Sequence, residues 1–481
     1  MLFNSFAFAV FFPLVALAYF LLPYRWRWAL LLAASYYFYM YWKVEYALLL
    51  VASTVVDFIA SNGIAKAQDQ VLRKRWLTLS ILTNLGILVT FKYFNFLNDS
   101  ARSVASGMGL DWPVPDTELL LPMGISFYTF QTMSYTIDVY RGHLAPTRHF
   151  GKFALYVTFF PQLVAGPIER APNLLPQFFK DIPFVADRVV QGLKQMLWGF
   201  FKKLVIADRV GLVVDHVYNA PAGQDGATLL LATVLFAIQI YCDFSGYSDI
   251  AIGAARVLGY DLMENFRTPF TAGSIREFWS RWHISLSTWF RDYVYVPLGG
   301  NRVGKWRWWT NLFVVFLISG LWHGASWTFV IWGALHGVYL IAALAFAPLW
   351  KRVEAALGVA RIPRTWRFMN VVATFLLVLV SWVFFRANSF ADIGLIFGRI
   401  AHWSGSLEAT KALFAHVGPG ILLVTLFFSV LFFVLDPWAD GYIKGKVRMP
   451  KGFSLAFYGT LLAMCLLFGH FGDTAFIYFQ F

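Results

Sequence analysis

Long apolar segments recur along the whole chain, and they constrain its fold more than any other feature. About 20 apolar residues suffice for a helix to cross a bilayer. Of the 481 residues, 59% are hydrophobic and only 14% are charged, well below the share of about 25% that is typical of globular proteins. We therefore predict an all-α polytopic membrane protein. The expected spans cover residues 5–22, 29–43, 45–62, 77–97, 121–140, 193–217, 228–258, 310–347 (as a hairpin), 368–386, 420–437 and 453–471.

Basic residues mark alternate connections between these spans. They follow the first, third and fifth spans and recur in residues 259–309, 351–367 and 444–451, whereas residues 98–120 carry four acids and one arginine. Because basic loops stay in the cytoplasm, we expect about a dozen crossings, with both chain ends outside and residues 259–309 inside. The same rule accounts for the net charge of +13, so nucleic acid is not an expected partner.

One apolar stretch does not fit this alternation. Residues 153–170 contain Pro161, Gly166 and Pro167, and they lie between two segments already assigned to the inside. Non-helical backbone at membrane depth persists only where protein or a water-filled cavity satisfies its polar groups. We therefore expect a re-entrant element that lines a cavity. No repeat or Gly/Ser linker divides the chain, so we expect one membrane domain over residues 1–481.

His323 is the first candidate for chemistry. It lies in the sequence SGLWHGASW, roughly 12 residues beyond Thr310, which corresponds to a helical rise of about 18 Å. That rise places the histidine near the middle or outer half of the bilayer, where an ionisable side chain indicates a function by default. A neutral imidazole can take a proton from a hydroxyl that attacks an acyl carbonyl. The alternative is a packing histidine bonded to a neighbouring carbonyl.

His283 is the second candidate. Residues 274–293 place tryptophans on one side of a helical wheel and a stripe containing His283 and Arg291 beside them. The pattern predicts an amphipathic helix on the cytoplasmic side, whose basic residues could face the phosphates of a soluble donor. The alternative is a plain interfacial helix with a solvated histidine.

Polar residues also occur inside the segment YCDFSGYSDIAIG, residues 241–253. Asp243 and Tyr247 are four residues apart and share one helix face. They form either a structural polar cluster or a group that orients a histidine or binds the donor. We assign His336 a structural role. The chain has no phosphate-binding GxxxxGK[ST] loop, no GxSxG motif and no HExxH motif, so we expect no bound metal and no ATP-driven chemistry.

Five motifs occur in order along the chain: PQLVAGPIER (161–170), YCDFSGYSDIAIG (241–253), ENFRTPF (264–270), REFWSRWHISLSTWFRDYVYVPLGGNR (276–302) and LWHGASWTFVIWGALHG (321–337). Together they resemble the membrane-bound O-acyltransferase (MBOAT) family, and specifically its bacterial alginate O-acetyltransferase-like branch. The resemblance implies a ring of membrane helices around a thinned centre with a tunnel through it. It also implies transfer of an acetyl group from cytoplasmic acetyl-CoA, a substrate rather than a permanently bound cofactor.

The resemblance maps the catalytic histidine of the family onto His323 and the second signature histidine onto His283. Asp243, Tyr247, Asn265 and Trp322 then become candidates for binding substrate or lining the tunnel. In this branch the enzyme is expected in the bacterial inner membrane, and the acetyl group often continues through a periplasmic partner of the SGNH-hydrolase type to an exopolysaccharide. Polysaccharide-synthesis proteins are therefore expected partners. Two rival functions are a secondary transporter of an acyl or sugar compound and a non-catalytic scaffold.

Overall fold

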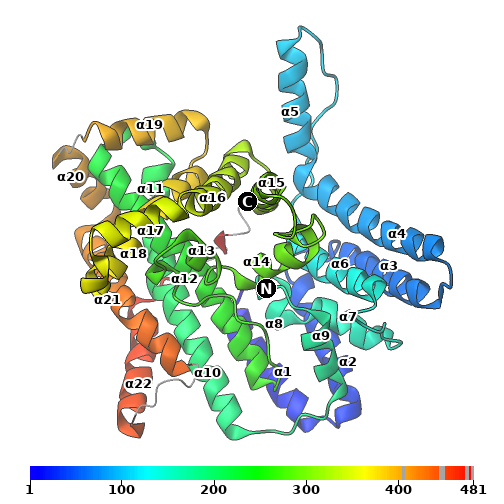
Figure 1. Cartoon of the computed structure of the whole chain (residues 1–481). Helices are drawn as coiled ribbons and strands as arrows, with labels where there is room; N and C mark the ends of the chain where they lie inside the picture. Colours follow the sequence, from blue (N-terminus) through cyan, green and yellow to red (C-terminus); the bar gives the residue numbers. More distant parts are fainter. Residues whose placement is uncertain (404–406, 444–449, 472–475, 478–481) are drawn as a thin grey trace. The chain divides into compact units, whose positions relative to one another are not determined.

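The computed structural model describes residues 1–403, 407–443, 450–471 and 476–477, and all regular structure within them is helical (Figure 1). The chain forms two compact units. The first comprises residues 1–196 with 250–263, and the second comprises residues 197–249 with 264–481. The prediction of a single membrane domain therefore stays a prediction, as do the ring and the central tunnel.

Seven helices among the described residues are long and apolar enough to cross a membrane, which confirms the polytopic all-α class. Each coincides with a predicted span. Helix α1 (Phe6–Leu21) is also apolar but shorter. The seven are α3 (Ala47–Lys66), the continuous run α4–η1–α5 (Gln70–Gly107), α12 (Gly226–Val257), α16 (Trp327–Ala345), α18 (Pro363–Arg386), α21 (Pro419–Ile443) and α22 (Lys451–Phe468).

The other predicted spans are helical too, but they are shorter, less apolar or interrupted. Residues 193–217 fall on three consecutive elements that include a π-helical segment, η3. These elements are α2 (Tyr24–Met40), α6 (Ile125–Arg141), α10 (Ala186–Phe200), η3 (Phe201–Ala207), α11 (Asp208–Tyr218) and α15 (Lys305–His323). Shorter helices connect them: α7 (Phe150–Thr158), α8 (Phe160–Leu163), α9 (Ala171–Leu174), α13 (Ile275–Trp279), α14 (Ile284–Phe290), α17 (Ala347–Ala356), α19 (Phe390–Ala401) and α20 (Leu407–Val417).

In the first unit, a buried polar cluster joins α3, α4 and α6. Asn84 of α4 donates to both carboxylate oxygens of Asp57 on α3, at 3.0 and 2.9 Å. Ser53 and Thr132 also donate to the Asn84 side-chain oxygen. A carboxylate away from water needs such hydrogen bonds, so the cluster fixes how these three helices pack.

The predicted break in residues 153–170 is confirmed. Helix α7 ends at Thr158, α8 covers only one turn around Pro161, and the backbone beyond it is irregular. The break is buried, and polar side chains satisfy its backbone groups: Gln131 of α6 donates to the Tyr156 carbonyl at 2.6 Å. Tyr156 in turn donates to the Glu169 carbonyl at 3.2 Å. The re-entrant path through a bilayer stays a prediction.

The predicted outside loop 98–120 is helical over its first half, and its placement outside the membrane stays a prediction. Helix α5 (Phe94–Gly107) continues from α4 through η1 and carries the chain beyond the predicted span (Figure 1). At about 1.5 Å per residue, the 38-residue run is about 57 Å long, well above a hydrocarbon thickness of about 30 Å. Asn98 of α5 anchors the return segment, because it accepts a hydrogen bond from Trp112 and donates to the Val114 carbonyl.

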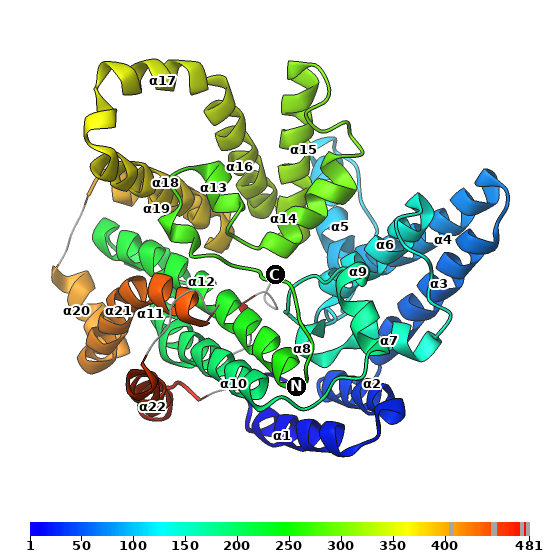
Figure 2. The ribbon, with the colours of Figure 1, turned by 60° about the horizontal axis from the view of Figure 1, so that its bottom comes forward.

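In the second unit, α15 and α16 form the predicted hairpin over residues 310–347, and they pack along each other (Figure 2). Glycines allow the close approach. A Cβ atom on Gly320 would lie 2.3 Å from the Phe329 carbonyl oxygen, and one on Gly333 would lie 2.2 Å from that of Phe316. The turn between the helices begins at Gly324, directly after His323. This geometry puts the first candidate histidine at the tip of the hairpin.

Candidate active site

His323 is the last residue of α15 and is buried, with 2% of its surface exposed. Aromatic rings surround it. The Trp332 ring of α16 lies edge-on with its centre 4.8 Å away, and the rings of Trp322 and Phe385 lie at 5.1 and 5.5 Å. These three aromatic rings pack directly around the imidazole of His323.

The predicted continuous helix over residues 274–293 is wrong. Helix α13 ends at Trp279, and α14 begins only at Ile284. Between them His283 takes the left-handed backbone conformation with φ of 44°, which is uncommon for residues other than glycine. The amphipathic segment is therefore divided into two short helices with His283 between them.

His283 is also not the solvated histidine of the alternative interpretation, because its exposed fraction is 0%. The Phe244 ring of α12 lies edge-on to its imidazole, with the ring centres 4.6 Å apart. Burial lowers the pKa of His283 to about 3, so this histidine is neutral at physiological pH. An uncharged imidazole can both donate and accept a hydrogen bond.

The structure brings three of the predicted site residues together. The imidazole rings of His283 and His323 have their centres 6.3 Å apart, and the Trp322 ring lies 5.8 Å from the first and 5.1 Å from the second. At this separation, one small acyl group can contact both imidazole rings. The chemical role of the pair stays a prediction.

Asn265, a fourth predicted residue, lies at the start of α14. Its backbone carbonyl accepts from the Ile284 N–H at 3.0 Å. Its side-chain oxygen accepts from the N–H and hydroxyl of Ser285, at 3.3 and 2.8 Å. Its amide nitrogen donates to Ser248 of α12 at 3.3 Å. These partners are all protein groups, and two of them, Ile284 and Ser285, directly follow His283 in the chain.

Asp243 and Tyr247 share one face of α12, as predicted, but Asp243 belongs to a buried ionic cluster. Lys203 of the π-helical segment η3 lies 2.7 Å from the Asp243 carboxylate and 2.8 Å from that of Asp208. The other Asp243 oxygen accepts from the Ile477 N–H at 2.7 Å. This geometry favours the structural polar cluster, one of the two interpretations of the sequence, for Asp243.

Sequence reasoning missed Lys203, Asp208 and the chain's C-terminal region. The Phe476 ring packs 4.7 Å from the Tyr247 ring and 5.4 Å from that of Phe244, which itself contacts His283. A signal was present for the lysine, because Lys202 and Lys203 interrupt an apolar segment in which charges are costly. No local pattern indicated the aromatic contact.

His336 has the contacts of a structural residue. Its Nδ1 accepts from the Trp279 indole at 3.2 Å, and its Nε2 lies 3.0 Å from the Ser381 hydroxyl. Since that hydroxyl donates to the Val378 carbonyl, the Nε2 position must carry the proton. His336 thus joins α13, α16 and α18 as a neutral tautomer with both nitrogens engaged.

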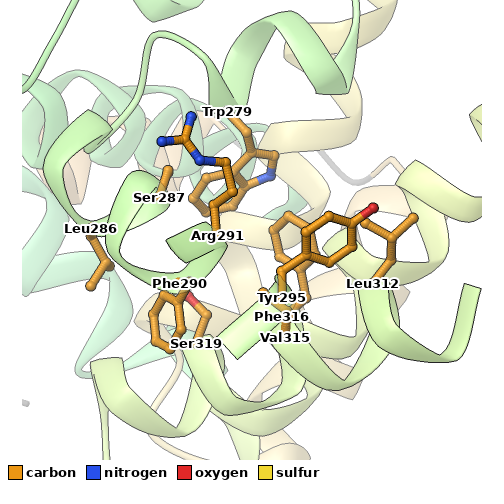
Figure 3. A pocket seen from close by; sticks show the side chains of 10 residues that line it. All are labelled: Trp279, Leu286, Ser287, Phe290, Arg291, Tyr295, Leu312, Val315, Phe316 and Ser319. Atoms are coloured by element: carbon orange, nitrogen blue, oxygen red, sulfur yellow. The ribbon is translucent and has the colours of Figure 1, made fainter. Parts of the chain in front are cut away.

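A cavity of about 250 Å³ lies between α13, α14, η6 (Arg291–Tyr295) and α15 (Figure 3). Its walls are mostly apolar and aromatic, and Arg291 and Ser287 supply polar groups. Ser287 follows His283 by four residues, and Ser319 precedes His323 by four residues. Each histidine therefore lies about one helical turn along the chain from a lining residue, and neither histidine itself lines the cavity. The lining residues are Trp279, Leu286, Ser287, Phe290, Arg291, Tyr295, Leu312, Val315, Phe316 and Ser319.

Comparison with known proteins adds an independent line of evidence. The model of the membrane-bound O-acyltransferase family matches residues 141–385, which include all six predicted site residues. The chain is 42% identical to the probable alginate O-acetylase AlgI of Azotobacter vinelandii over 391 residues, or 80% of this chain and 74% of that protein. It is 34% identical to the peptidoglycan O-acetyltransferase of Helicobacter pylori over 81% of this chain and 77% of that protein.

A more distant relative is the teichoic acid D-alanyltransferase of Bacillus subtilis, which is 29% identical over 57% of this chain and 71% of that protein. All three relatives carry names that describe acyl transfer. The helices long enough to span a bilayer agree with the membrane-bound character of the family. The chain therefore belongs to the membrane-bound O-acyltransferase family and is a multi-pass membrane O-acyltransferase.

Proposed function

We propose that this chain is an inner-membrane O-acetyltransferase that moves acetyl groups from cytoplasmic acetyl-CoA to a periplasmic hydroxyl, for O-acetylation of a polysaccharide. The observation that carries the proposal is the pairing of His323 with His283, whose ring centres are 6.3 Å apart in a buried aromatic cluster. Relatives named for O-acetylation of alginate and peptidoglycan support the acetyl group and the polysaccharide.

In the proposed reaction His323 is the general base. Its unprotonated ring nitrogen accepts the proton of the acceptor hydroxyl while the hydroxyl oxygen attacks the thioester carbonyl carbon. The carbon–sulfur bond then breaks, and the coenzyme A thiolate leaves and takes the proton from the imidazolium. The products are the O-acetyl ester and free coenzyme A. Because a thiolate leaves readily, the step needs no strong acid.

His283 and the cavity beside it suit the donor. A neutral imidazole can donate a hydrogen bond to the thioester carbonyl oxygen and so hold the acetyl group toward His323. The cavity suits the pantetheine arm of coenzyme A, and the Arg291 guanidinium can bind one of its phosphates (Figure 3). The names of the three relatives reported above describe acyl transfer, so they favour the enzyme over the secondary-transporter alternative.

We further propose a separate periplasmic partner of the SGNH type that accepts the acetyl group and passes it to the polysaccharide. The predicted outside segments 98–120, 218–227 and 387–418 are too short to hold a glycan-binding domain with its own core. Reconstitution with acetyl-CoA and candidate glycan, with and without the partner, tests this step. Efficient glycan acetylation by this chain alone would refute the relay.

The catalytic proposal is tested with radiolabelled acetyl-CoA and purified wild-type protein in nanodiscs. H323A should lower acetyl transfer by about 10²- to 10⁴-fold, the usual contribution of a general base. H143A is the matched control, since His143 is an exposed histidine outside the site. If H323A, at equal protein level, transfers acetyl groups as fast as H143A, His323 is not the base.

A further inference from the structure

Asn265 has contacts that explain how His283 is held. The N–H groups of the first two residues of α14 both bond to Asn265, one to its backbone oxygen and one to its side-chain oxygen. These are two of the N–H groups that a helix cannot satisfy internally. Asn265 therefore caps α14 from a separate segment of the chain.

The N-cap position of α14 is occupied by His283, whose side chain does not cap the helix. Capping by a residue from outside the helix is important for this reason. The imidazole of this histidine instead packs against Phe244, Trp322 and His323. Serine, threonine, aspartate and asparagine are the residues that usually cap a helix start. Here an asparagine at another position performs that task, and the imidazole can turn toward the site.

The same asparagine connects α14 to α12. Its amide nitrogen donates to Ser248, which lies four residues after Phe244 on one face of α12. Phe244 is the residue whose ring contacts the His283 imidazole. The three anchoring residues are nearly inaccessible to solvent, with exposed fractions of 1% for Asn265, 0% for Ser285 and 2% for Ser248. Water therefore does not compete for these hydrogen bonds.

We propose that Asn265 is a positioning residue that acts through His283, rather than a residue that contacts the substrate. By holding the first turn of α14, it keeps His283 in the left-handed conformation and its ring against Phe244. Non-glycine residues in that conformation persist where surrounding structure enforces them, and they cluster at functional sites. The inference rests on the proposed function, in which His283 contributes to acetyl transfer.

A double-mutant cycle tests the proposal. Acetyl transfer by purified protein in nanodiscs is measured for wild type, N265A, H283A and N265A/H283A. We expect N265A to lower kcat/KM by up to about 100-fold in the wild-type background, as a misplacement of about 1 Å does. It should change kcat and KM in the same directions as H283A. In the H283A background it should have less than about a twofold further effect, because the residue it positions is gone.

Additive effects of N265A and H283A would overturn the proposal and return Asn265 to a direct substrate contact. N98A is the matched control, because Asn98 is also a buried asparagine that anchors a loop to a helix. N265D keeps an oxygen that can accept from Ser285, so it should recover part of the activity. If N265A fails to fold, N265D and S285A take its place in the cycle.

The cycle also separates the two proposals. If H283A alone retains the wild-type rate, the proposed contribution of His283 fails, whatever N265A does. The other outcome is that H283A lowers the rate and N265A lowers it by the same factor in the H283A and wild-type backgrounds. In that case only the positioning role of Asn265 fails.

Discussion

Replacing Lys203 by methionine should destabilise the second unit strongly. Lys203 lies between the carboxylates of Asp208 and Asp243, at 2.8 and 2.7 Å. The side chains of Lys203 and Asp208 are 2% exposed and that of Asp243 is 5% exposed. Methionine fills a similar volume without the charge, so K203M leaves two buried carboxylates without their shared cation.

The burial of the cluster decides the expected magnitude. A solvent-exposed ion pair contributes only about 0–1 kcal/mol. Removal of one partner from a buried pair costs about 3–5 kcal/mol, because the remaining charge is left uncompensated. Since all three side chains are almost inaccessible, we expect K203M to lower the free energy of unfolding by about 3–5 kcal/mol. The triple variant K203M/D208N/D243N carries no buried charge in the cluster and should recover most of this loss.

The assay is reversible unfolding by SDS titration in mixed micelles, followed by tryptophan fluorescence. K351M is the matched control, because Lys351 is exposed and its replacement should change the free energy of unfolding by less than about 0.5 kcal/mol. A loss below about 1 kcal/mol for K203M, which is the range of surface pairs, would refute the reasoning. A triple variant no more stable than K203M would show that the loss comes from packing and not from charge.

Three further predictions concern the hairpin, a surface network and the topology. G333A should separate α15 from α16 and lower acetyl transfer at least about 10-fold, because the new Cβ would lie 2.2 Å from the Phe316 carbonyl oxygen. The control is G398A, because nothing lies within 4 Å of a Cβ at that position. Equal activity of the two variants would contradict the packing argument. Hydrogen bonds from Arg367 lower the pKa of Glu277 below its usual 4.5, so the stability from this network is present above pH 4.5 and fades as the pH falls through the lowered value. E277Q should abolish the contribution of the Glu277–Arg367 pair to the pH dependence of stability, which is about 1 kcal/mol or less for a partly exposed pair. If E277Q and wild type show the same pH profile of thermal unfolding, the pair makes no such contribution. A cysteine at position 305 should react with a membrane-impermeant maleimide only after the inner face is exposed, and labelling from outside intact cells would overturn the predicted topology.

Elements that depend on local composition could be predicted from the sequence. The apolar spans correspond to helices such as α3, α12 and α18, because a helix satisfies its own backbone and needs only lipid around it. The hairpin over residues 310–347 and the break near Pro161 were also predictable, since glycine and proline act on the backbone at their own position. The family motifs predicted the class of reaction, which the comparisons confirm, and they singled out the two histidines, whose roles stay predictions.

The environment of the site residues was decided only by tertiary structure. Residues 274–293 have the period of a single helix, yet the helix breaks before His283, and Asn265 from another segment caps the helix that follows. Asp243 finds its cation in Lys203, 40 residues earlier, and the Phe476 ring reaches Tyr247 from near the chain end. A periodic pattern reports which face of a segment is apolar, but it holds no information about which distant group completes a hydrogen bond, balances a charge or fills a contact. Those partners are brought together only when the helices pack, and the backbone conformation and complete burial of His283 belong to that packed state.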